Sequence, residues 1–171
     1  MTSTKGNHPR EELQSILAQD KPEYVRTLFD NIAGDYDRMN WIMTGGLLAL
    51  WHRAFIKETK LTAGGIALDV CCGTGDLTLL MAKHTSHTDA SKGGRVVGLD
   101  FSENMLTVAR KREEAVRQGQ SSTPLAPVDW VQGDAMDLPY PTGDDRRGFD
   151  CVTMGFALRN VSDVGGAIKE M

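Results

Sequence analysis

The segment Leu68-Asp69-Val70-Cys71-Cys72-Gly73-Thr74-Gly75-Asp76 decides the fold. It continues an apolar run that starts at Ile66 and is typical of a buried strand, and the residues from Asp76 to Lys83 have a helical pattern. Gly73 and Gly75 remove side chains where a ligand would approach the backbone, and the start of the following helix presents free N–H groups. The segment therefore predicts a strand, a glycine loop and a helix that bind a small polar cofactor.

The loop does not fit the common phosphate-binding patterns. A dinucleotide fingerprint requires G-x-G-x-x-G, but its third glycine position is Thr78 here, and the G-K-[ST] of a P-loop is absent. These differences argue against NAD and ATP as ligands.

Three further short apolar runs predict strands at 95–100, 128–131 and 149–155. The second strand leads into a helix that Ser102 is expected to cap. All the strands are apolar enough to be buried between layers of helices. The fold class expected is α/β with a mainly parallel sheet.

Acidic residues follow two of these strands. Asp100 ends the second strand, and Asp134 follows the third in Gln132-Gly133-Asp134-Ala135. Ligands of open α/β sheets bind along the carboxyl ends of the strands. A carboxylate at Asp100 can accept hydrogen bonds from ribose hydroxyls, and one at Asp134 from an adenine amino group, although a strand-end Asp is also a common helix cap or loop residue. The order of the loop and both carboxylates favours a nucleoside-containing cofactor.

Residues 1–64 form the first expected unit, a helical segment that packs on the sheet, and residues 65–171 form the second, an α/β core. Apolar side chains recur at helical spacing around 13–17, 24–32 and 45–57. Polar segments at 84–94, 118–127 and 141–148 are expected to be surface loops.

Composition excludes several classes of protein. The 171 residues include 19 Lys and Arg against 23 Asp and Glu, a net charge of −4, so there is no global cationic field for nucleic acid. No apolar run reaches the length of a membrane span, and the first eight residues lack a secretory h-region. We therefore expect a cytoplasmic protein with no nucleic-acid partner.

The cysteines and histidines give no strong metal pattern. Cys71, Cys72 and Cys151 are expected to be reduced thiols, and the first two are better interpreted as small residues behind the loop than as nucleophiles. His84 and His87 with Asp89 form the one candidate metal set, but a solvated loop is the favoured interpretation. No metal is expected.

A helical period continues from Ser162, the expected N-cap, to Met171 without a stop signal. We therefore expect a truncated chain in which the edge of the fourth strand is uncovered. A second copy of the chain, or a rearrangement, would cover that edge.

Several segments in order resemble the ubiquinone and menaquinone biosynthesis C-methyltransferases, from about Tyr24 to the last residue. They are FDNIAGDYDRMN (29–40), DVCCGTGD (69–76), VGLDFS (97–102), GDA (133–135) and GFALRNV (155–161). The Cys-Cys-Gly-Thr loop and the Met-Gly-Phe of the fourth strand are most similar to the bacterial demethylmenaquinone methyltransferases.

The resemblance implies a class I methyltransferase fold that binds S-adenosyl-L-methionine and lacks the C-terminal half of its relatives. Thr74 and the backbone of the two loop glycines would face the methionine moiety, Asp100 the ribose, and Asp134 with Ala135 the adenine. Asp69 and Phe101 complete the cofactor-binding set that the matched motifs imply. Where some relatives have Ser in the fourth strand, this chain has Gly155, so no side-chain contact carries over there.

The reaction implied is methylation of a ring carbon of demethylmenaquinol, a lipid-tailed quinol, to menaquinol. The residues expected to act on the substrate are Tyr36, Arg159 and Asn160. Arg159 would stabilise the developing quinolate, because it stays protonated. The Asp35-Tyr36-Asp37 cluster and a water held at 159–160 are both candidates for the base.

Each of these assignments has an alternative. Tyr36 fits core packing as well as substrate contact, and the two flanking Asp residues fit the cap of a turn. Arg159 and Asn160 also fit a strand-to-helix loop that only satisfies backbone groups. The apolar stripe from Trp41 to Phe55 fits either the packing of helices or an entrance for an isoprenoid tail at a membrane surface. For the whole chain, the alternatives are a methyltransferase of another quinol or small molecule, and a non-catalytic truncated form.

Overall fold

A computed structural model describes residues 48–87, 93–119, 124–140 and 148–171. Its helices and strands are, in chain order, α4 (Leu48–Thr59), β1 (Ile66–Val70), α5 (Asp76–Thr85), β2 (Arg95–Asp100), α6 (Glu103–Gln118), β3 (Val128–Gln132), β4 (Cys151–Thr153) and α7 (Val164–Glu170). The predicted helices within 13–32 lie outside the described residues, as does Tyr36. The helix predicted at 45–57 is confirmed from residue 48 onward.

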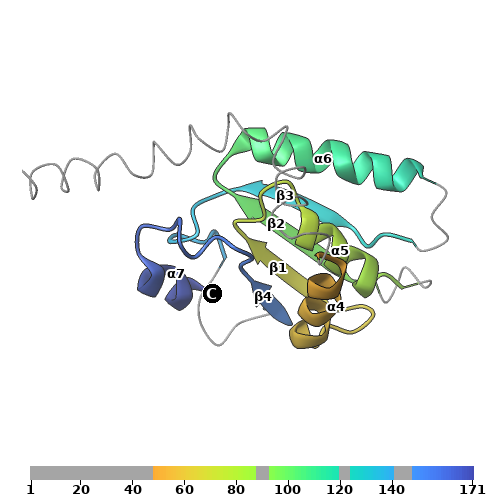
Figure 1. The fold of residues 1–171 in the computed structure, drawn as a ribbon, viewed down its shortest axis with the longest axis horizontal. Helices are drawn as coiled ribbons and strands as arrows, with labels where there is room; N and C mark the ends of the chain where they lie inside the picture. The colour runs from red at the N-terminus through yellow and green to blue at the C-terminus, as the bar shows by residue number, and fades with distance from the viewer. Residues whose placement is uncertain (1–47, 88–92, 120–123, 141–147) are drawn as a thin grey trace, which may run out of the picture.

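The four strands form one parallel sheet in the order β3-β2-β1-β4 (Figure 1). The chain moves outward from β1 to β2 and β3, and then returns to place β4 on the other side of β1. The strand order therefore reverses between β1 and β4, and the crevice for ligands of open α/β sheets lies at the carboxyl ends of strands at such a reversal. This reversal places the loop after β1 at the expected binding edge.

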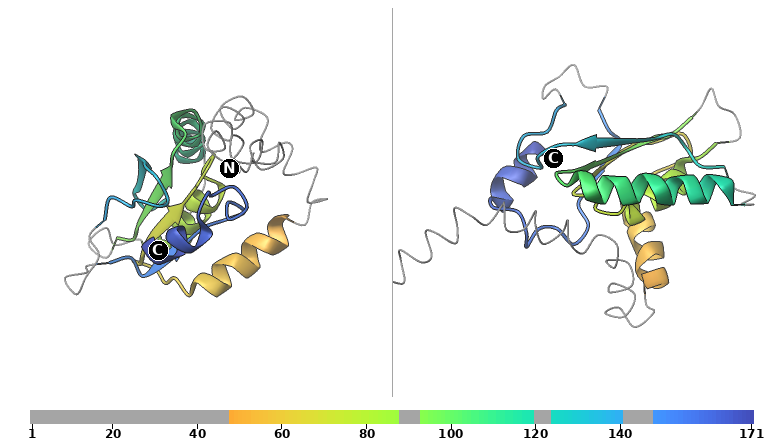
Figure 2. Two further views of the ribbon diagram at one scale, coloured as in Figure 1. Left: turned by 90° about the vertical axis from the view of Figure 1, so that its left-hand side faces the viewer. Right: turned by 90° about the horizontal axis from the view of Figure 1, so that it is seen from above.

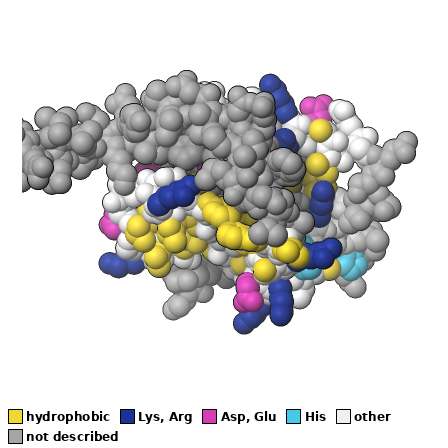
Figure 3. Space-filling view, in the orientation of Figure 1, with side chains coloured by type: hydrophobic (Ala, Val, Ile, Leu, Met, Phe, Trp, Pro, Cys, Tyr) yellow, Lys and Arg dark blue, Asp and Glu magenta, His cyan; other side chains and the backbone are white. Residues whose placement is uncertain are grey.

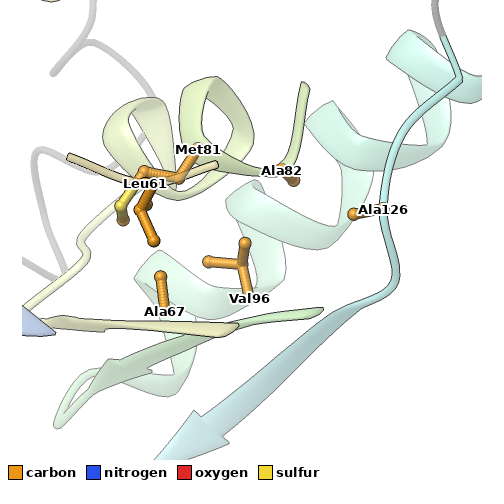
Figure 4. Close-up of a cluster of buried hydrophobic side chains, with 6 residues drawn as sticks. All are labelled: Leu61, Ala67, Met81, Ala82, Val96 and Ala126. Carbon is orange, nitrogen blue, oxygen red and sulfur yellow. The ribbon is translucent and has the colours of Figure 1, made fainter. Parts of the chain in front are cut away.

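Helices α5 and α6 pack on one face of the sheet, α4 packs against α5, and α7 lies near the carboxyl ends of the strands (Figures 1 and 2). The buried side chains between the sheet and these helices come from strands, helices and the segments that join them. They are Leu61, Ala67, Met81, Ala82, Val96 and Ala126 (Figure 4). Three of these six residues are alanines, one on β1, one on α5 and one before β3.

The opposite face of the sheet carries a second buried cluster. Its strand residues are Leu68, Val70, Val97 and Leu99, which alternate along β1 and β2 with those of the first cluster. Ala135 and Leu138 cover them from the segment after β3. Both faces of β1 and β2 are thus buried, which explains their nearly continuous apolar runs.

One row of side chains crosses the sheet directly under the start of α5. Trp130, Gly98, Asp69 and Thr153 are register partners on β3, β2, β1 and β4. A Cβ at Gly98 would lie 2.7 Å from the Trp130 ring, so glycine at this position lets the indole lie over the neighbouring strand. The row brings a carboxylate and an aromatic ring beneath the glycine loop.

The cap predicted for the last helix is wrong by one residue. The N-cap of α7 is Asp163, whose carboxylate accepts a hydrogen bond from the Gly166 amide at 3.0 Å, and Ser162 precedes it. Both residue types cap helices well, so the pattern does not distinguish adjacent candidates. The predicted cap of α6 is confirmed, because the Ser102 hydroxyl accepts from the Met105 amide.

Candidate active site

The loop between β1 and α5 is shaped by three left-handed residues. Cys71, Gly73 and Gly75 have φ values of 57°, 55° and 83°. The two glycines adopt this conformation without the steric penalty that a Cβ brings. The Cys72 amide donates to the Leu99 carbonyl, so the loop turns across the end of β2.

The two loop glycines have different surroundings. A Cβ at Gly75 would lie 2.4 Å from the Trp130 ring, so glycine there permits close packing inside the protein. A Cβ at Gly73 would meet no described atom within 4 Å. Gly73 is therefore the point at which the loop backbone has open space beside it, as a bound ligand requires.

Asp100 joins the loop to the end of β2. Its Oδ2 accepts a hydrogen bond from the Gly73 amide at 2.8 Å, and its Oδ1 accepts from the Ser102 amide at 2.9 Å. The residue is only 4% exposed. The structure thus brings together two residues that lie 27 positions apart and that the sequence predicts for the same ligand.

Asp69 is buried under the loop, and its carboxylate accepts hydrogen bonds from two threonine hydroxyls. Thr78 Oγ1 donates to Oδ2 at 2.6 Å, and Thr153 Oγ1 donates to Oδ1 at 3.0 Å. Burial raises the pKa of Asp69 to about 6, although these hydrogen bonds partly offset the effect of burial. Asp69 therefore organises α5 and β4 from within the protein.

The carboxylates of Asp69, Asp100 and Asp134 all act on the Cys71 thiol. Burial first, and then these three negative charges, raise the pKa of Cys71 to about 12. Burial also raises the pKa of Cys72 and of Cys151. The thiols are thus protonated at neutral pH, which disfavours them as nucleophiles. The same carboxylates make the loop favourable for a ligand that carries positive charge.

The remaining predicted cofactor residues lie at the ends of β2 and β3. Phe101 is half-buried, and its carbonyl accepts from Gln132 Nε2 at 3.0 Å. Asp134 is exposed and its Oδ1 accepts from the Met136 amide at 2.9 Å, while Ala135 is buried. The Asp134 carboxylate therefore stabilises a turn, which is the loop role that the sequence left open. Asp134 nevertheless lies at the predicted binding edge of the sheet.

Of the three predicted catalytic residues, two lie in the described part of the chain. Arg159 is exposed, and Asn160 is half-buried, with its backbone N–H donating to the Ala157 carbonyl at 2.7 Å. Both follow β4, on the other side of the strand-order reversal from β2. In the described part of the chain, no hydrogen bond or ion pair joins either side chain to the predicted cofactor residues.

Sequence reasoning missed the residues that support the loop from behind. Arg112 on α6 donates to the Thr74 carbonyl and hydroxyl and to the Asp76 carboxylate. The sequence does contain a pattern that could have indicated Arg112. This residue follows the buried Met105 and Ala109 at helical spacing, so it is a cation on the apolar side of the helix. Thr78 and Thr153 likewise are polar residues within apolar elements.

The candidate metal loop is described only in part. His84 Nε2 lies 3.0 Å from the Leu61 carbonyl oxygen, and Asp89 is outside the described residues. Within the described ranges, no group of three or more metal-binding side chains is found.

No helix in the described part of the chain is long and apolar enough to cross a bilayer.

The chain has the same fold as several solved proteins that are described as S-adenosyl-L-methionine-dependent methyltransferases. A putative enzyme of this kind from Methanococcus maripaludis superposes with a TM-score of 0.60 at 21% identity, over 82% of this chain and 56% of its own. The YcgJ protein of Bacillus subtilis superposes with a TM-score of 0.55 at 26% identity, over 70% of this chain and 43% of its own. The parallel sheet and its glycine loop thus define a class I methyltransferase fold, as predicted.

A model of the ubiE/COQ5 methyltransferase family matches residues 17–171, and the chain belongs to that family. The demethylmenaquinone methyltransferase of Symbiobacterium thermophilum is 43% identical over 90% of this chain and 55% of its own length. That of Staphylococcus saprophyticus is 40% identical over 88% and 57%, respectively. The chain spans little more than half the length of these relatives.

Proposed function

We propose that this chain binds S-adenosyl-L-methionine at the carboxyl edge of the sheet and takes part in the C-methylation of demethylmenaquinol to menaquinol. The observation that carries the proposal is the hydrogen bond from the Gly73 amide to Asp100. It joins the open glycine loop to a strand-end carboxylate at the strand-order reversal, where nucleoside ligands of such sheets bind. Family membership supplies the reaction class.

The residues present fit this cofactor. When bound, S-adenosyl-L-methionine supplies an electrophilic methyl group on a positively charged sulfonium. The open backbone at Gly73, with the backbone of Thr74 and Gly75, would hold its methionine moiety, while the buried Asp69 would support the loop from below. The carboxylates around the loop complement its charge. Asp100 and Phe101 would hold the ribose, and Asp134 with Ala135 would hold the adenine.

The substrate would approach from the β4 side of the site. Arg159 and Asn160, which follow β4, would orient the quinol ring. A water held at 159–160, or the Asp35-Tyr36-Asp37 cluster, would accept the hydroxyl proton, and the Arg159 guanidinium would stabilise the quinolate oxygen that forms. Tyr36 is proposed as a third substrate residue. Orienting the two reactants is the larger task, because a quinolate ring carbon is already nucleophilic.

An exposed apolar surface supports a lipid-tailed substrate. The rings of Trp51 on α4 and Phe156 after β4 stack with centroids 5.8 Å apart, yet they remain 54% and 55% exposed. Leu50 and Leu158 are exposed residues of the same two segments, and apolar side chains also gather on the face seen in Figure 3. This surface would receive the isoprenoid tail and rest on a membrane surface in the cytoplasm.

Two proposals concern the organisation of the chain. Residues 1–64 would form a helical unit beside the α/β core of residues 65–171. Among the described strands β4 pairs only with β1, so its outer edge is open to pairing. A second copy of the chain would cover that edge, and light scattering on the purified chain tests this homo-oligomer.

Transfer of a radiolabelled methyl group from S-adenosyl-L-methionine to demethylmenaquinol tests the proposed reaction. We expect labelled menaquinol from the wild-type chain and a loss of at least 100-fold for Asp100→Ala. Asp129→Ala, which changes an exposed carboxylate in β3, is the matched control and should retain activity. Cofactor binding without transfer to this quinol would instead favour another methyl acceptor.

A further inference from the structure

Helix α6 supports the glycine loop from the side opposite Asp100. A Cβ at Gly75 would lie 3.1 Å from the Ala109 Cβ as well as against the Trp130 ring. The Trp130 indole N–H donates to Glu113 Oε2 on the same helix at 2.7 Å. The end of the loop thus packs directly against Ala109 of α6 and Trp130 of β3, a surface called here the α6–β3 wall.

Arg112 makes the polar contacts between this wall and the loop. Its Nη1 donates to the Thr74 carbonyl at 3.1 Å and to the Thr74 hydroxyl at 3.0 Å. Its Nη2 donates to Asp76 Oδ1 at 2.7 Å, while His52 Nε2 lies 3.6 Å from the other Asp76 oxygen. The guanidinium therefore spans the last loop residues and the first residue of α5.

The geometry points to Arg112 as a positioning residue for the cofactor site, an inference that depends on the proposed function. Arg112 fixes Thr74 and Asp76 on either side of the left-handed Gly75, while Asp100 fixes Gly73 from the front. With both anchors in place, the loop backbone has one conformation before the ligand arrives. Arg112 itself faces the back of the loop and acts on the ligand only through it.

The shape of the guanidinium matters as well as its charge. Two separate nitrogens serve Thr74 and Asp76 at once, which a lysine ammonium on a flexible stem does not reproduce in one geometry. Hydrogen bonds from a charged donor are about twice as strong as neutral ones, and both contacts are partly buried. Loss of the two-nitrogen contact of Arg112 should therefore increase the mobility of the loop more than loss of an exposed ion pair would.

The test compares Arg112→Met and Arg112→Lys with Arg110→Met, which removes an exposed arginine paired with Glu103 on the same helix. Two quantities are measured well below the unfolding temperature: hydrogen exchange of the Gly73 amide by NMR, and the affinity for S-adenosylhomocysteine by calorimetry. We expect Arg112→Met to accelerate exchange and weaken binding, each by roughly 10- to 100-fold. Arg112→Lys should be intermediate, and Arg110→Met should match the wild type.

Unchanged Gly73 exchange in Arg112→Met overturns the inference, as does a lowered unfolding temperature with unchanged affinity. If Arg112→Met does not fold, Arg112→Lys decides by the same two criteria. If the wild-type chain binds no S-adenosylhomocysteine, the proposed function fails. Gly73 exchange then decides the loop role alone: acceleration in the Arg112 variants supports it, and unchanged exchange overturns it.

Discussion

At the scale of single residues, Gly73 and Gly75 look alike in the sequence and differ in the structure. Both are left-handed, but Gly73 has open space beside it and Gly75 lies against Trp130. The sequence predicts that both serve the ligand. It could not predict the difference, because the wall behind Gly75 comes from β3 and α6, which are distant in the chain.

This difference gives a paired prediction. Gly75→Ala adds left-handed strain and a clash with an aromatic ring, so it should lower the free energy of unfolding by about 2–5 kcal/mol. Gly73→Ala adds only the strain, about 1–2 kcal/mol, but places a methyl group where the ligand approaches. Urea denaturation and calorimetry with S-adenosylhomocysteine measure the two effects. A larger stability loss in Gly73→Ala would contradict this distinction.

Asp69 makes stability depend on pH. Its pKa is about 6 in the folded protein against an ordinary value of 3.8, so between these values the folded state holds a proton that the unfolded state has lost. The free energy of unfolding therefore falls as the pH rises through this range. Its contribution is full below pH 4 and gone above pH 6.

Asp69→Asn removes this titration while keeping the shape of the side chain. Relative to the variant, the wild type should lose about 2 kcal/mol of stability between pH 4.5 and pH 7.5. Chemical denaturation of both proteins across that range is the measurement, since other titrating groups cancel in the difference. A difference that is flat with pH would show that burial does not raise this pKa.

At the scale of elements, the apolar runs predicted β1 and β2 well because both of their faces are buried. The prediction for β4 was too long: residues 149–155 were expected and Cys151–Thr153 form the strand. On either side of this strand, Phe149 and Met154 pack on the second cluster without forming strand. The apolar pattern therefore indicates which side chains are buried here, but not which residues make the backbone hydrogen bonds of the sheet.

The N-cap of α7 is Asp163 and not the predicted Ser162, and this difference can be tested. Asp163→Ala should destabilise the helix by about 1 kcal/mol, because the Gly166 amide loses its acceptor. Ser162→Ala is the control and should change little. Hydrogen exchange at the Gly166 amide is the direct measurement: faster in the first variant and unchanged in the second. Faster exchange in Ser162→Ala alone would restore the original assignment.

At the scale of the whole molecule, the sequence predicted the parallel sheet, the glycine loop and the strand-end carboxylates. It did not predict the supports of the site, namely Arg112 behind the loop and the threonines around Asp69. The Arg112 contacts join residues 36–38 positions apart, and the Thr153 contact to Asp69 joins residues 84 positions apart, across the strand-order reversal; only Thr78 lies near Asp69 in the chain, 9 positions away. Local pattern alone carries no information about such pairs.

We propose that the edge of the sheet between the Gly73 loop and Asp100 binds S-adenosyl-L-methionine. Calorimetric titration of the folded 171-residue chain with S-adenosylhomocysteine tests it most directly, with folding checked by circular dichroism. We expect saturable binding at one site, weakened at least 100-fold in a folded Asp100→Asn variant and unchanged in Asp129→Ala. A folded wild-type chain without binding, or equal affinity in Asp100→Asn, would contradict it.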